Sequence, residues 1–355
     1  MKKHFHNFLR LMMLIGLGIL IYFVGILVID SAWDYRPENT VLKITPAAEK
    51  SLIQDRDSFS LLSWNIGYAG LGCRSDFFYD GGRMTKPSRE DFDQYWKGIQ
   101  GQLSVLDSID FIMLQEVDIS SARSYRTDQH AAISRILEKY TAVFVKNYDV
   151  IYVPVPLFNP LSGITSGLSS FSLYPFISAA SVVFPANYSW PKKLFMPDRC
   201  FIYSEIMLPS GKKLILINTH NSAFDDGSLR NSQLNILYEY MERAYREGYY
   251  VIAGGDWNMN PEGYSNIPFI SGDPAFKLSD IEGVSGPGAG WHVVYDPDYP
   301  TNRDVSALYQ PGLTQTTIID YYICSPNIHV LNTMTLYNGF SNSDHHPVYM
   351  RFGLE

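Results

Sequence analysis

Several apolar segments of the chain end in, or contain, polar residues of the types that carry out acid–base chemistry and bind metal ions. They are Asn65, Glu116, His220, Asp256, Asn258, Asp320, Asp344 and His345. Taken alone, each of these residues fits a turn or a surface position, because His, Asp and Asn are common in loops. Such positions do not explain why the pattern recurs at one apolar segment after another. Functional sites of layered α/β folds form where strand ends meet, so the sequence predicts one site assembled from these residues.

These residue types suit phosphoester hydrolysis assisted by a divalent cation. Carboxylate and amide oxygens bind hard cations, which makes Glu116 and Asn65 candidate ligands for Mg²⁺, with Mn²⁺ as an alternative. Asp256 and Asn258 are two positions apart, a spacing that puts both side chains on one face of an extended segment. One of them can hold the attacking water while the other holds a phosphoryl oxygen. A cation that neutralises the phosphate and a base for water are the requirements of this reaction.

The segment SDHHP, residues 343–347, places a carboxylate and two imidazoles just before the last apolar segment. A histidine that is hydrogen-bonded to a carboxylate can act as a general acid or base. We expect His345 to be catalytic and held by its neighbour Asp344, with Asp320 across the site as the other candidate partner. Consecutive residues of an extended segment face opposite ways, so His346 is expected to be structural.

Short apolar segments predict the strands that position these residues. The predicted strands are 59–66, 110–117, 141–148, 178–184, 201–208, 213–219, 250–257, 317–324, 330–337 and 347–352. Two stretches have helical spacing instead, one along Phe92, Trp96, Ile99, Leu103 and Leu106 and one along Leu234, Leu237, Met241 and Ala244. Many strands and few helices, without strict alternation, indicate a mixed, layered α/β domain. Residues 149–170 and 264–316 are rich in Pro, Gly or aromatic residues and are predicted to be long loops.

The N-terminal segment, residues 1–33, differs from the rest of the chain. Nineteen residues without charge, Leu11 to Ile29, follow Lys2, Lys3 and Arg10. This run is long enough to span a bilayer, and no small-x-small cleavage motif follows it. An uncleaved, single-pass anchor is therefore favoured over a cleaved signal peptide or a buried helix. The basic residues before the run predict a cytoplasmic N-terminus, and therefore an extracytoplasmic catalytic domain. We expect a linker over residues 34–57 and the catalytic domain over residues 58–355.

Charge and cysteine content restrict the function classes further. The formal net charge is −8, and Lys and Arg occur at most in pairs, which argues against tight binding of a long polyanion. Cys73, Cys200 and Cys324 are far apart and form no C-x-x-C motif, so a structural zinc site is not expected. One disulfide can form outside the cytoplasm, and the sequence does not select the pair.

Six segments, SWNIG, LQEVD, INTHNS, GGDWN, IDYYICSP and SDHHPV, together resemble the endonuclease/exonuclease/phosphatase superfamily in type and order. Members include deoxyribonuclease I, abasic-site endonucleases, neutral sphingomyelinases and inositol polyphosphate 5-phosphatases. The resemblance covers residues 58–353. It implies a four-layer α/β sandwich with two packed mixed sheets flanked by helices, here preceded by one transmembrane helix. The N-T-H context of His220 looks more like the sphingomyelinase, phosphatase and deoxyribonuclease I branches than the abasic-site endonucleases.

The resemblance also implies roles for the polar residues. Glu116 is the main Mg²⁺ ligand with Asn65 beside it, and Asp256 and Asn258 handle the water and the phosphate. His220 and His345 contact the phosphate or shuttle protons, and Asp320 and Asp344 orient these histidines or bind the metal through water. Arg199, which lies beside Cys200, is a candidate for binding a phosphate, with a structural role as the alternative. The choice of general base between His345 and Asp256 stays open.

The substrate is predicted less sharply than the chemistry. We favour a membrane-tethered hydrolase acting on a lipid headgroup, because the anchor keeps the site near a bilayer. The apolar segment 150–158 could touch lipid, although aromatic stretches more often belong to a core. The alternatives are an extracytoplasmic metal-dependent nuclease, an enzyme for a small soluble phosphoester, and a non-catalytic tethered binding module. The last is disfavoured because Glu116, Asp256 and His345 are all present.

Overall fold

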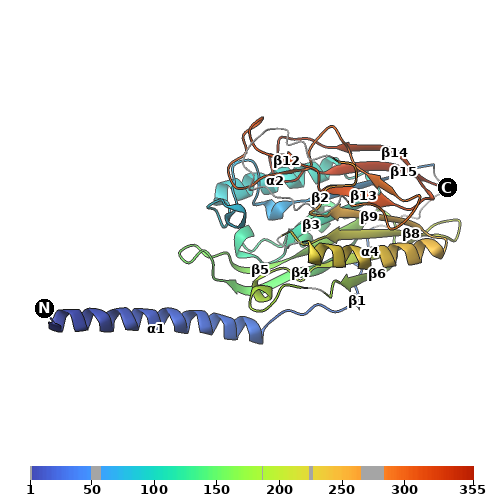
Figure 1. Ribbon diagram of the computed structural model, residues 1–355. Helices are drawn as coiled ribbons and strands as arrows, with labels where there is room; N and C mark the ends of the chain where they lie inside the picture. Colours follow the sequence, from blue (N-terminus) through green and yellow to red (C-terminus); the bar gives the residue numbers. More distant parts are fainter. Residues whose placement is uncertain (1, 49–56, 186, 224–226, 265–283) are drawn as a thin grey trace.

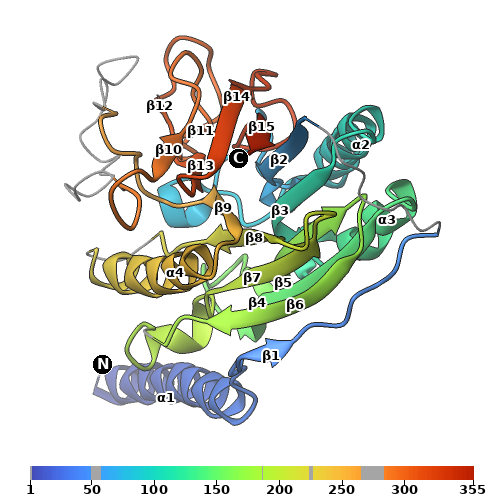
Figure 2. The same ribbon diagram turned by 90° about the vertical axis from the view of Figure 1, so that its right-hand side faces the viewer.

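Two β-sheets pack face to face in the computed structural model, and helices cover their outer faces (Figures 1 and 2). The structure describes residues 2–48, 57–185, 187–223, 227–264 and 284–355. The longer helices are α1 (Lys2–Ala32), α2 (Arg89–Val105), α3 (Gln129–Ile136) and α4 (Ser228–Arg246). Short 3-10 helices are η1 (Gly67–Ala69), η2 (Phe78–Asp80), η3 (Ala122–Ser124) and η4 (Lys192–Phe195). The predicted four-layer sandwich is confirmed.

The strands of the two sheets follow a mixed order. The first sheet runs β1 (Thr40–Val41), β6 (Phe176–Val183), β7 (Cys200–Met207), β8 (Lys213–His220), β9 (Tyr250–Asp256), β13 (Asp320–Cys324), β10 (His292–Val294). The second runs β14 (Ile328–Thr335), β15 (Val348–Leu354), β2 (Phe59–Asn65), β3 (Phe111–Asp118), β5 (Ser162–Ser172), β4 (Thr141–Val153). A separate ribbon pairs β11 (Asn302–Arg303) with β12 (Thr316–Thr317). The β2–β3 and β8–β9 pairs are parallel, so their carboxyl ends lie at one edge.

Helices form the outer layers because each has one apolar face. The α2 face of Phe92, Ile99 and Leu103 packs with α3 on the second sheet, and α4 packs on the first sheet. Ser88 caps α2 by accepting a 3.0 Å hydrogen bond from the Asp91 amide. The predicted faces of α2 and α4 are confirmed, except that Tyr95 rather than Trp96 is fully buried. Helix α3 was not predicted, because its eight residues are too few for a clear period.

A polar bridge crosses the interface between the sheets close to the strand ends. Gln115 on β3 donates from Nε2 to Asn218 Oδ1 on β8 over 2.8 Å. Asn218 Nδ2 lies within 3.0–3.2 Å of three acceptors, the Leu114 and Ser169 carbonyl oxygens and Ser170 Oγ. Both amides are fully buried, so the bridge fixes how β3 and β8 align along their lengths.

Two predicted loops contain regular structure. The prediction for residues 149–170 was wrong, because β4 continues to Val153 and β5 begins at Ser162, leaving only a turn over residues 154–161. The many Pro and Gly residues of this stretch belong to the turn and to closely packed strand positions. Strands β10, β11 and β12 lie in the described part of 264–316, and residues 265–283 lie outside the described residues.

The predicted linker, residues 34–57, follows the surface of the domain over part of its length. Strand β1 pairs with β6, and Thr45 forms an isolated bridge to Ala142 on β4. Residues 49–56 lie outside the described residues. Cys73, Cys200 and Cys324 are unpaired, so the disulfide considered above does not form in this structure.

Helix α1 extends away from the sandwich (Figure 1). Residues Lys3–Ala32 are long and apolar enough to cross a membrane, and a signal sequence can have the same length and composition. The C-terminal part of α1 packs against β4 and η4. Ile26 and Asp30, one helical turn apart, are buried there.

Removing the bridging amide tests whether it holds the sheets together. We expect Asn218→Ala to lower the free energy of unfolding by about 1–3 kcal/mol, because it leaves buried polar groups without partners. Chemical denaturation followed by tryptophan fluorescence measures this change. Asn332→Ala, on an exposed position of β14, is the control and should change it by less than about 0.5 kcal/mol. Equal effects of the two substitutions would contradict the role given to the bridge.

Candidate active site

The predicted site residues gather at one edge of the sandwich because several strands begin or end there. Asn65, His220 and Asp256 are the last residues of β2, β8 and β9, and Asp320 is the first residue of β13. Glu116 lies in β3 at an irregularity in the pairing with β5, with a positive φ of 53°. An interruption of this kind bends a strand and changes the direction of its side chain.

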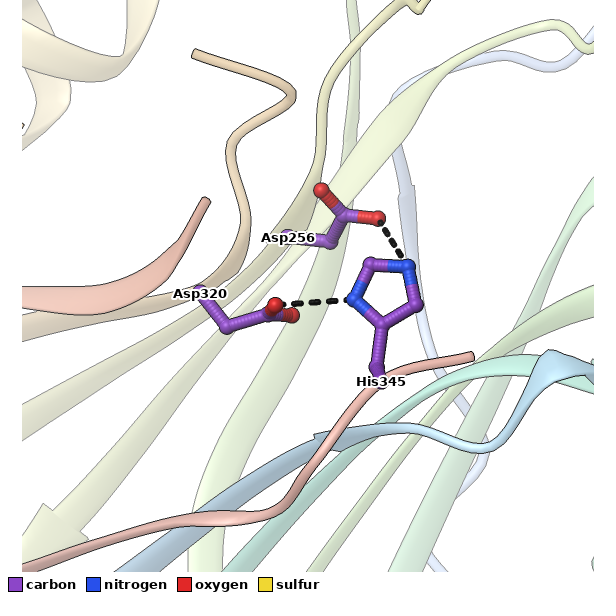
Figure 3. Close-up of side chains that lie close together, drawn as sticks. All are labelled: Asp256, Asp320 and His345. Atoms are coloured by element: carbon purple, nitrogen blue, oxygen red, sulfur yellow. Dashed lines mark hydrogen bonds and ion pairs between the residues drawn. The ribbon is translucent and has the colours of Figure 1, made fainter. Parts of the chain in front are cut away.

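Asp320 and His345 form the shortest contact among the predicted catalytic groups (Figure 3). His345 Nδ1 lies 2.8 Å from Asp320 Oδ2, and both side chains are buried. Asp344 Oδ2 is 3.9 Å from the other ring nitrogen, Nε2. The expectation that Asp344 holds His345 was therefore wrong, and Asp320 takes that position. Consecutive residues of an extended segment face opposite ways, which directs the Asp344 and His345 side chains apart.

The backbone around His345 is held by neighbouring elements. Trp64 Nε1 donates to the His345 carbonyl oxygen over 3.0 Å, and the His345 amide donates to Ser343 Oγ over 3.1 Å. Asn302 on β11 forms an isolated bridge with His345. The neighbouring His346 accepts from the Phe340 amide at Nε2 and lies 2.8 Å from the Pro300 carbonyl oxygen at Nδ1. It is fully buried outside the site, as expected of a structural residue.

Opposed influences act on the charge of His345. Burial alone would lower its pKa, but the carboxylates of Asp320, Asp256 and Asp344 outweigh burial and raise the pKa to about 10. Asn302 Nδ2 lies 2.9 Å from Nε2, and a hydrogen bond donated from this amide favours the neutral ring. Nε2 also points toward Asp256 Oδ2 at 3.7 Å. The ring can thus hold a proton on Nδ1 for Asp320 and exchange one at Nε2.

Asp256 is the most densely contacted carboxylate of the site. Asn65 Nδ2 donates to Oδ2 over 2.9 Å, and the Asn258 amide donates to Oδ1 over 3.0 Å. His220 Nε2 lies 3.3 Å from Oδ2. Burial and the charge of Asp320 raise the pKa of Asp256 to about 7, against the opposing effect of His345. A carboxylate with such a pKa can accept a proton near neutral pH.

Asn258 and His220 lie beside Asp256. The Asn258 side chain donates to the Asn221 carbonyl oxygen over 2.9 Å, and Arg230 Nη1 donates to the Asn258 carbonyl oxygen over 2.8 Å. Arg230 is buried behind the site. Burial, followed by the charges of Arg199, His345 and Arg123, lowers the pKa of His220 well below its ordinary value. His220 is therefore neutral.

Glu116 is the most accessible carboxylate of the predicted set. Its Oε1 lies 4.0 Å from His220 Nε2, and its Oε2 lies 4.0 Å from Arg123 Nη2. Asp118 holds Arg123 through two hydrogen bonds of 3.1 and 3.0 Å. The Arg123 guanidinium lies 3.6 Å from the centre of the Tyr68 ring. Sequence reasoning missed Arg123, because its only signal is proximity to Glu116 along the chain.

Two groups of ligand atoms could hold a cation. Glu116 and the Asn65 Oδ1, which accepts from the Gly67 amide over 3.0 Å, offer the oxygen ligands that Mg²⁺ prefers. Burial raises the pKa of Asp344, the charge of His345 opposes this effect, and the charge of Glu116 adds to it. A second group, Asp256, Asp320 and His345, has ligand atoms within 4.8 Å of one another. Its Asp320–His345 hydrogen bond already uses two of these atoms.

A cavity of about 850 Å³ opens beside these residues. Its polar lining includes Glu116, Arg199, Asp256 and His345. Its apolar wall comes from other elements, namely Phe77, Tyr79, Tyr148, Leu161, Ile164 and Met196. Asp80 also faces it, and burial followed by the charges of Asp344, Asp304 and Glu116 raises the pKa of Asp80 to about 7. The cavity thus combines an ionic end with an apolar wall.

Arg199 is a cation of the cavity without a fixed partner. Burial lowers its pKa, against the opposing charges of Glu116 and Asp256. Within the described residues, its guanidinium makes no hydrogen bond or ion pair. A partly buried guanidinium with no partner among the described residues can receive a phosphate. The sequence singled out Arg199 for this role but gave no sign of Asn302, which lies in a stretch without strand periodicity.

Replacing the carboxylate that contacts His345 should lower the pKa of this histidine. In Asp320→Asn, with one negative charge fewer beside the ring, we expect a decrease of roughly 1–3 units. A pH titration of the histidine ring signals by NMR measures this decrease in pKa, with Asp93→Asn on the exposed face of α2 as the control.

Because the folded-state pKa of His345, about 10, lies above the ordinary 6.5, the ion pair stabilises the fold below pH 6.5. This contribution is lost as the pH rises through 10. An unchanged His345 pKa in Asp320→Asn would contradict the assigned contact.

Comparison with known proteins places this fold. No family model and no curated protein matches the sequence. An endonuclease/exonuclease/phosphatase from Beutenbergia cavernae is similar in structure at 18% identity, with a TM-score of 0.58 over 84% of this chain and 72% of that chain. ANGEL2, described as a 2′,3′-cyclic phosphatase, matches at 15% identity with a TM-score of 0.54 over 88% and 98%. D. rerio TDP2, complexed with a single-strand DNA product, matches at 17% identity with a TM-score of 0.52 over 83% and 99%. The chain has the fold of the endonuclease/exonuclease/phosphatase superfamily.

Proposed function

We propose that this chain is a phosphoester hydrolase that depends on a divalent cation, Mg²⁺ or Mn²⁺, and acts on the phosphorylated headgroup of a lipid. The observation that carries the proposal is the joining of the Asp320–His345 pair, Asp256, Glu116 and Arg199 in one cavity, where the Arg199 side chain has no hydrogen-bond or ion-pair partner among the described residues. A base, an acid, an oxygen site for a cation and a guanidinium for the phosphate are the groups that this reaction needs.

The charges of the site suggest how its residues divide the work. Glu116 and Asn65 would hold the cation, with Asp344 nearby, and the cation would neutralise the phosphate oxygens. Asp256, with a pKa raised to about 7, accepts the proton of the attacking water. As the water oxygen bonds to phosphorus, the P–O ester bond breaks and His345 donates its Nε2 proton to the leaving oxygen. Asp320 keeps the Nδ1–H in place throughout.

The remaining residues bind and orient the substrate in this proposal. Arg199 and the side chain of Asn258 contact phosphate oxygens. Neutral His220 lies 3.3 Å from Asp256 and fixes the position of this carboxylate. Arg123 balances part of the negative charge around Glu116. The order of their pKa values, about 7 and about 10, supports Asp256 as the base and His345 as the acid.

A lipid substrate is supported by α1 and by the lining of the cavity. The helix has the length and composition of a membrane anchor, and we propose that its N-terminus is cytoplasmic and the catalytic domain extracytoplasmic. The apolar wall of Phe77, Tyr79 and Leu161 suits a substrate with an apolar part. The acidic groups around the cavity and the net charge of −8 disfavour a long polyanion.

A metal-dependent nuclease is the second candidate. The observation that favours it is the fold shared with TDP2, whose structure holds a single-strand DNA product. The likeness to ANGEL2 likewise points to phosphoesters derived from nucleic acid. A small soluble phosphoester as substrate would leave the apolar wall without a role. A tethered binding module without activity would leave the catalytic groups without a role.

Parallel assays of four substrates distinguish these functions. The full chain in lipid nanodiscs is offered a choline sphingolipid, a phosphoinositide, plasmid DNA and p-nitrophenyl phosphate, with Mg²⁺ and with a chelator. We expect release of a headgroup or of phosphate from a lipid, abolished by the chelator. Nicked plasmid with intact lipid would replace the lipid hydrolase by the nuclease. Absence of any hydrolysis would contradict the proposed function.

Substitution of the proposed metal ligand tests the mechanism. Glu116→Gln should lower the rate on the order of 10²–10³-fold, because it removes the charged oxygen that holds the cation. It should also abolish the increase in melting temperature that Mn²⁺ gives to the unsubstituted chain. Glu239→Gln on the exposed face of α4 is the matched control and should change neither value. A normal rate for Glu116→Gln would remove Glu116 from the site.

A further inference from the structure

Helix α1 is fixed to the catalytic domain by side-chain contacts at two levels. Near its C-terminal end, Trp190 Nε1 donates to Ser31 Oγ over 3.4 Å, and Lys193 Nζ lies 3.4 Å from Asp34 Oδ2 just beyond the helix. Nine residues earlier, Tyr22 Oη lies 3.2 Å from Tyr152 Oη at the end of β4. Contacts at both levels set the orientation of the domain relative to the helix.

Aromatic and basic side chains mark one of these levels. Trp33 and Trp190 are exposed at the C-terminal end of α1, and Lys192 lies over the Tyr188 ring at 4.1 Å. Trp and Tyr with nearby Lys are typical of the boundary between a bilayer and water. If α1 enters a membrane, this group lies at the surface of the leaflet nearest the catalytic domain.

The other level lies deeper along the helix. Ser31 and Tyr22 are nine residues apart, which corresponds to about 14 Å along an α-helix. The Tyr152 hydroxyl therefore lies beside the apolar part of α1, on the membrane side of the aromatic group. The turn of residues 154–161 follows Tyr152 directly. In Figure 1 the turn between β4 and β5 projects toward the N-terminal end of α1.

The turn has the composition of a segment that enters lipid. Phe158 is 96% exposed and Leu157 49% exposed, although both are large apolar side chains. No charged residue occurs from Val150 to Pro191. The turn has three prolines, at 154, 156 and 160. Proline has no backbone N–H, so no donor at these positions loses a hydrogen bond to water when the turn enters lipid. The amides of Asn159 and Leu161 already donate to Pro156 and Val155 carbonyl oxygens. These features reduce the unfavourable free energy of transferring the turn from water into lipid.

The elements that contact α1 also line the active-site cavity. Tyr148 on β4, and Leu161 and Ile164 at the base of the turn, belong to its apolar wall. Met196 and Pro197, which follow η4, line it as well. The position of the β4–β5 turn therefore determines where the cavity meets the membrane surface.

We propose that the β4–β5 turn, residues 154–161, inserts beside α1 into the same bilayer and holds the mouth of the cavity at the lipid surface. The proposal rests on the membrane anchorage included in the proposed function. It gives α1 a second role, because the helix then sets the depth and orientation of the domain and does not only tether it.

Depth-dependent fluorescence quenching tests the insertion without reference to activity. Cys73→Ser removes the one partly exposed thiol, since Cys200 and Cys324 are buried. An environment-sensitive dye is then attached to the full chain at Phe158→Cys, in nanodiscs with bromine on the lipid acyl chains. We expect the emission maximum of the dye to shift to the blue, and most of its emission to be quenched by the brominated lipid. Leu331→Cys is the control, because Leu331 is 49% exposed like Leu157 and belongs to β14, which lies on the far side of the sandwich from α1 (Figure 1). Equal emission in brominated and ordinary lipid at position 158 would overturn the proposal.

Activity measurements separate this inference from the substrate assignment. Phe158→Ser should lower hydrolysis of a bilayer phospholipid about tenfold, the ratio expected from loss of one buried aromatic side chain. It should leave hydrolysis of p-nitrophenyl phosphate unchanged, and Leu331→Ser should change neither rate. An equal loss on both substrates would contradict insertion, because it would indicate damage to the site. If the unsubstituted chain hydrolyses no lipid, the substrate proposal fails while the quenching result still decides the insertion.

Discussion

The candidate site depends on the charge repulsion between two carboxylates, Asp256 and Asp320, which the imidazole of His345 offsets. Asp256 and Asp320 are direct partners in the antiparallel register of β9 and β13, and like charges in such positions repel each other. His345 lies between them, with one ring nitrogen 2.8 Å from Asp320 and the other 3.7 Å from Asp256. A positive imidazole there offsets the repulsion, whereas a neutral one leaves it in place. The carboxylates raise the pKa of His345 against the effect of burial, whereas burial and, after it, the charge of Asp320 raise the pKa of Asp256 against the effect of His345.

The residues around this group come from both sheets, so their spacing depends on how the sheets align. Gln115 and Asn218 bridge the sheets one residue before Glu116 and two residues before His220. The carboxyl ends of the parallel pairs β2–β3 and β8–β9 then meet at the same edge. His345 is added from a third direction by the bridge of its backbone to Asn302 on β11. Groups that are far apart in the sequence are thus positioned by the buried Gln115–Asn218 contact, by the parallel strand pairs and by the bridge between His345 and Asn302.

The sequence predicts the members of the site better than their contacts. Asn65, Glu116, His220 and Asp256 were recognisable because each lies near the end of an apolar segment, and Asp320 because it interrupts one. The partner of His345 was not, since proximity along the chain favoured Asp344 and only the strand register brings Asp320 close. The β4–β5 hairpin was missed for a different reason. Its Pro and Gly residues indicate a loop locally, while the long-range pairing of β4 with β5 determines the structure.

The position of the cation tests the central claim most directly. The claim is that Glu116 and Asn65 bind it, while Asp256, Asp320 and His345 remain free for proton transfer. A crystal of the domain soaked in Mn²⁺ gives an anomalous scattering peak at the metal position. The peak is predicted beside Glu116, with the 2.8 Å contact between His345 and Asp320 preserved. A peak among Asp256, Asp320 and His345, with that contact broken, would contradict the division of roles.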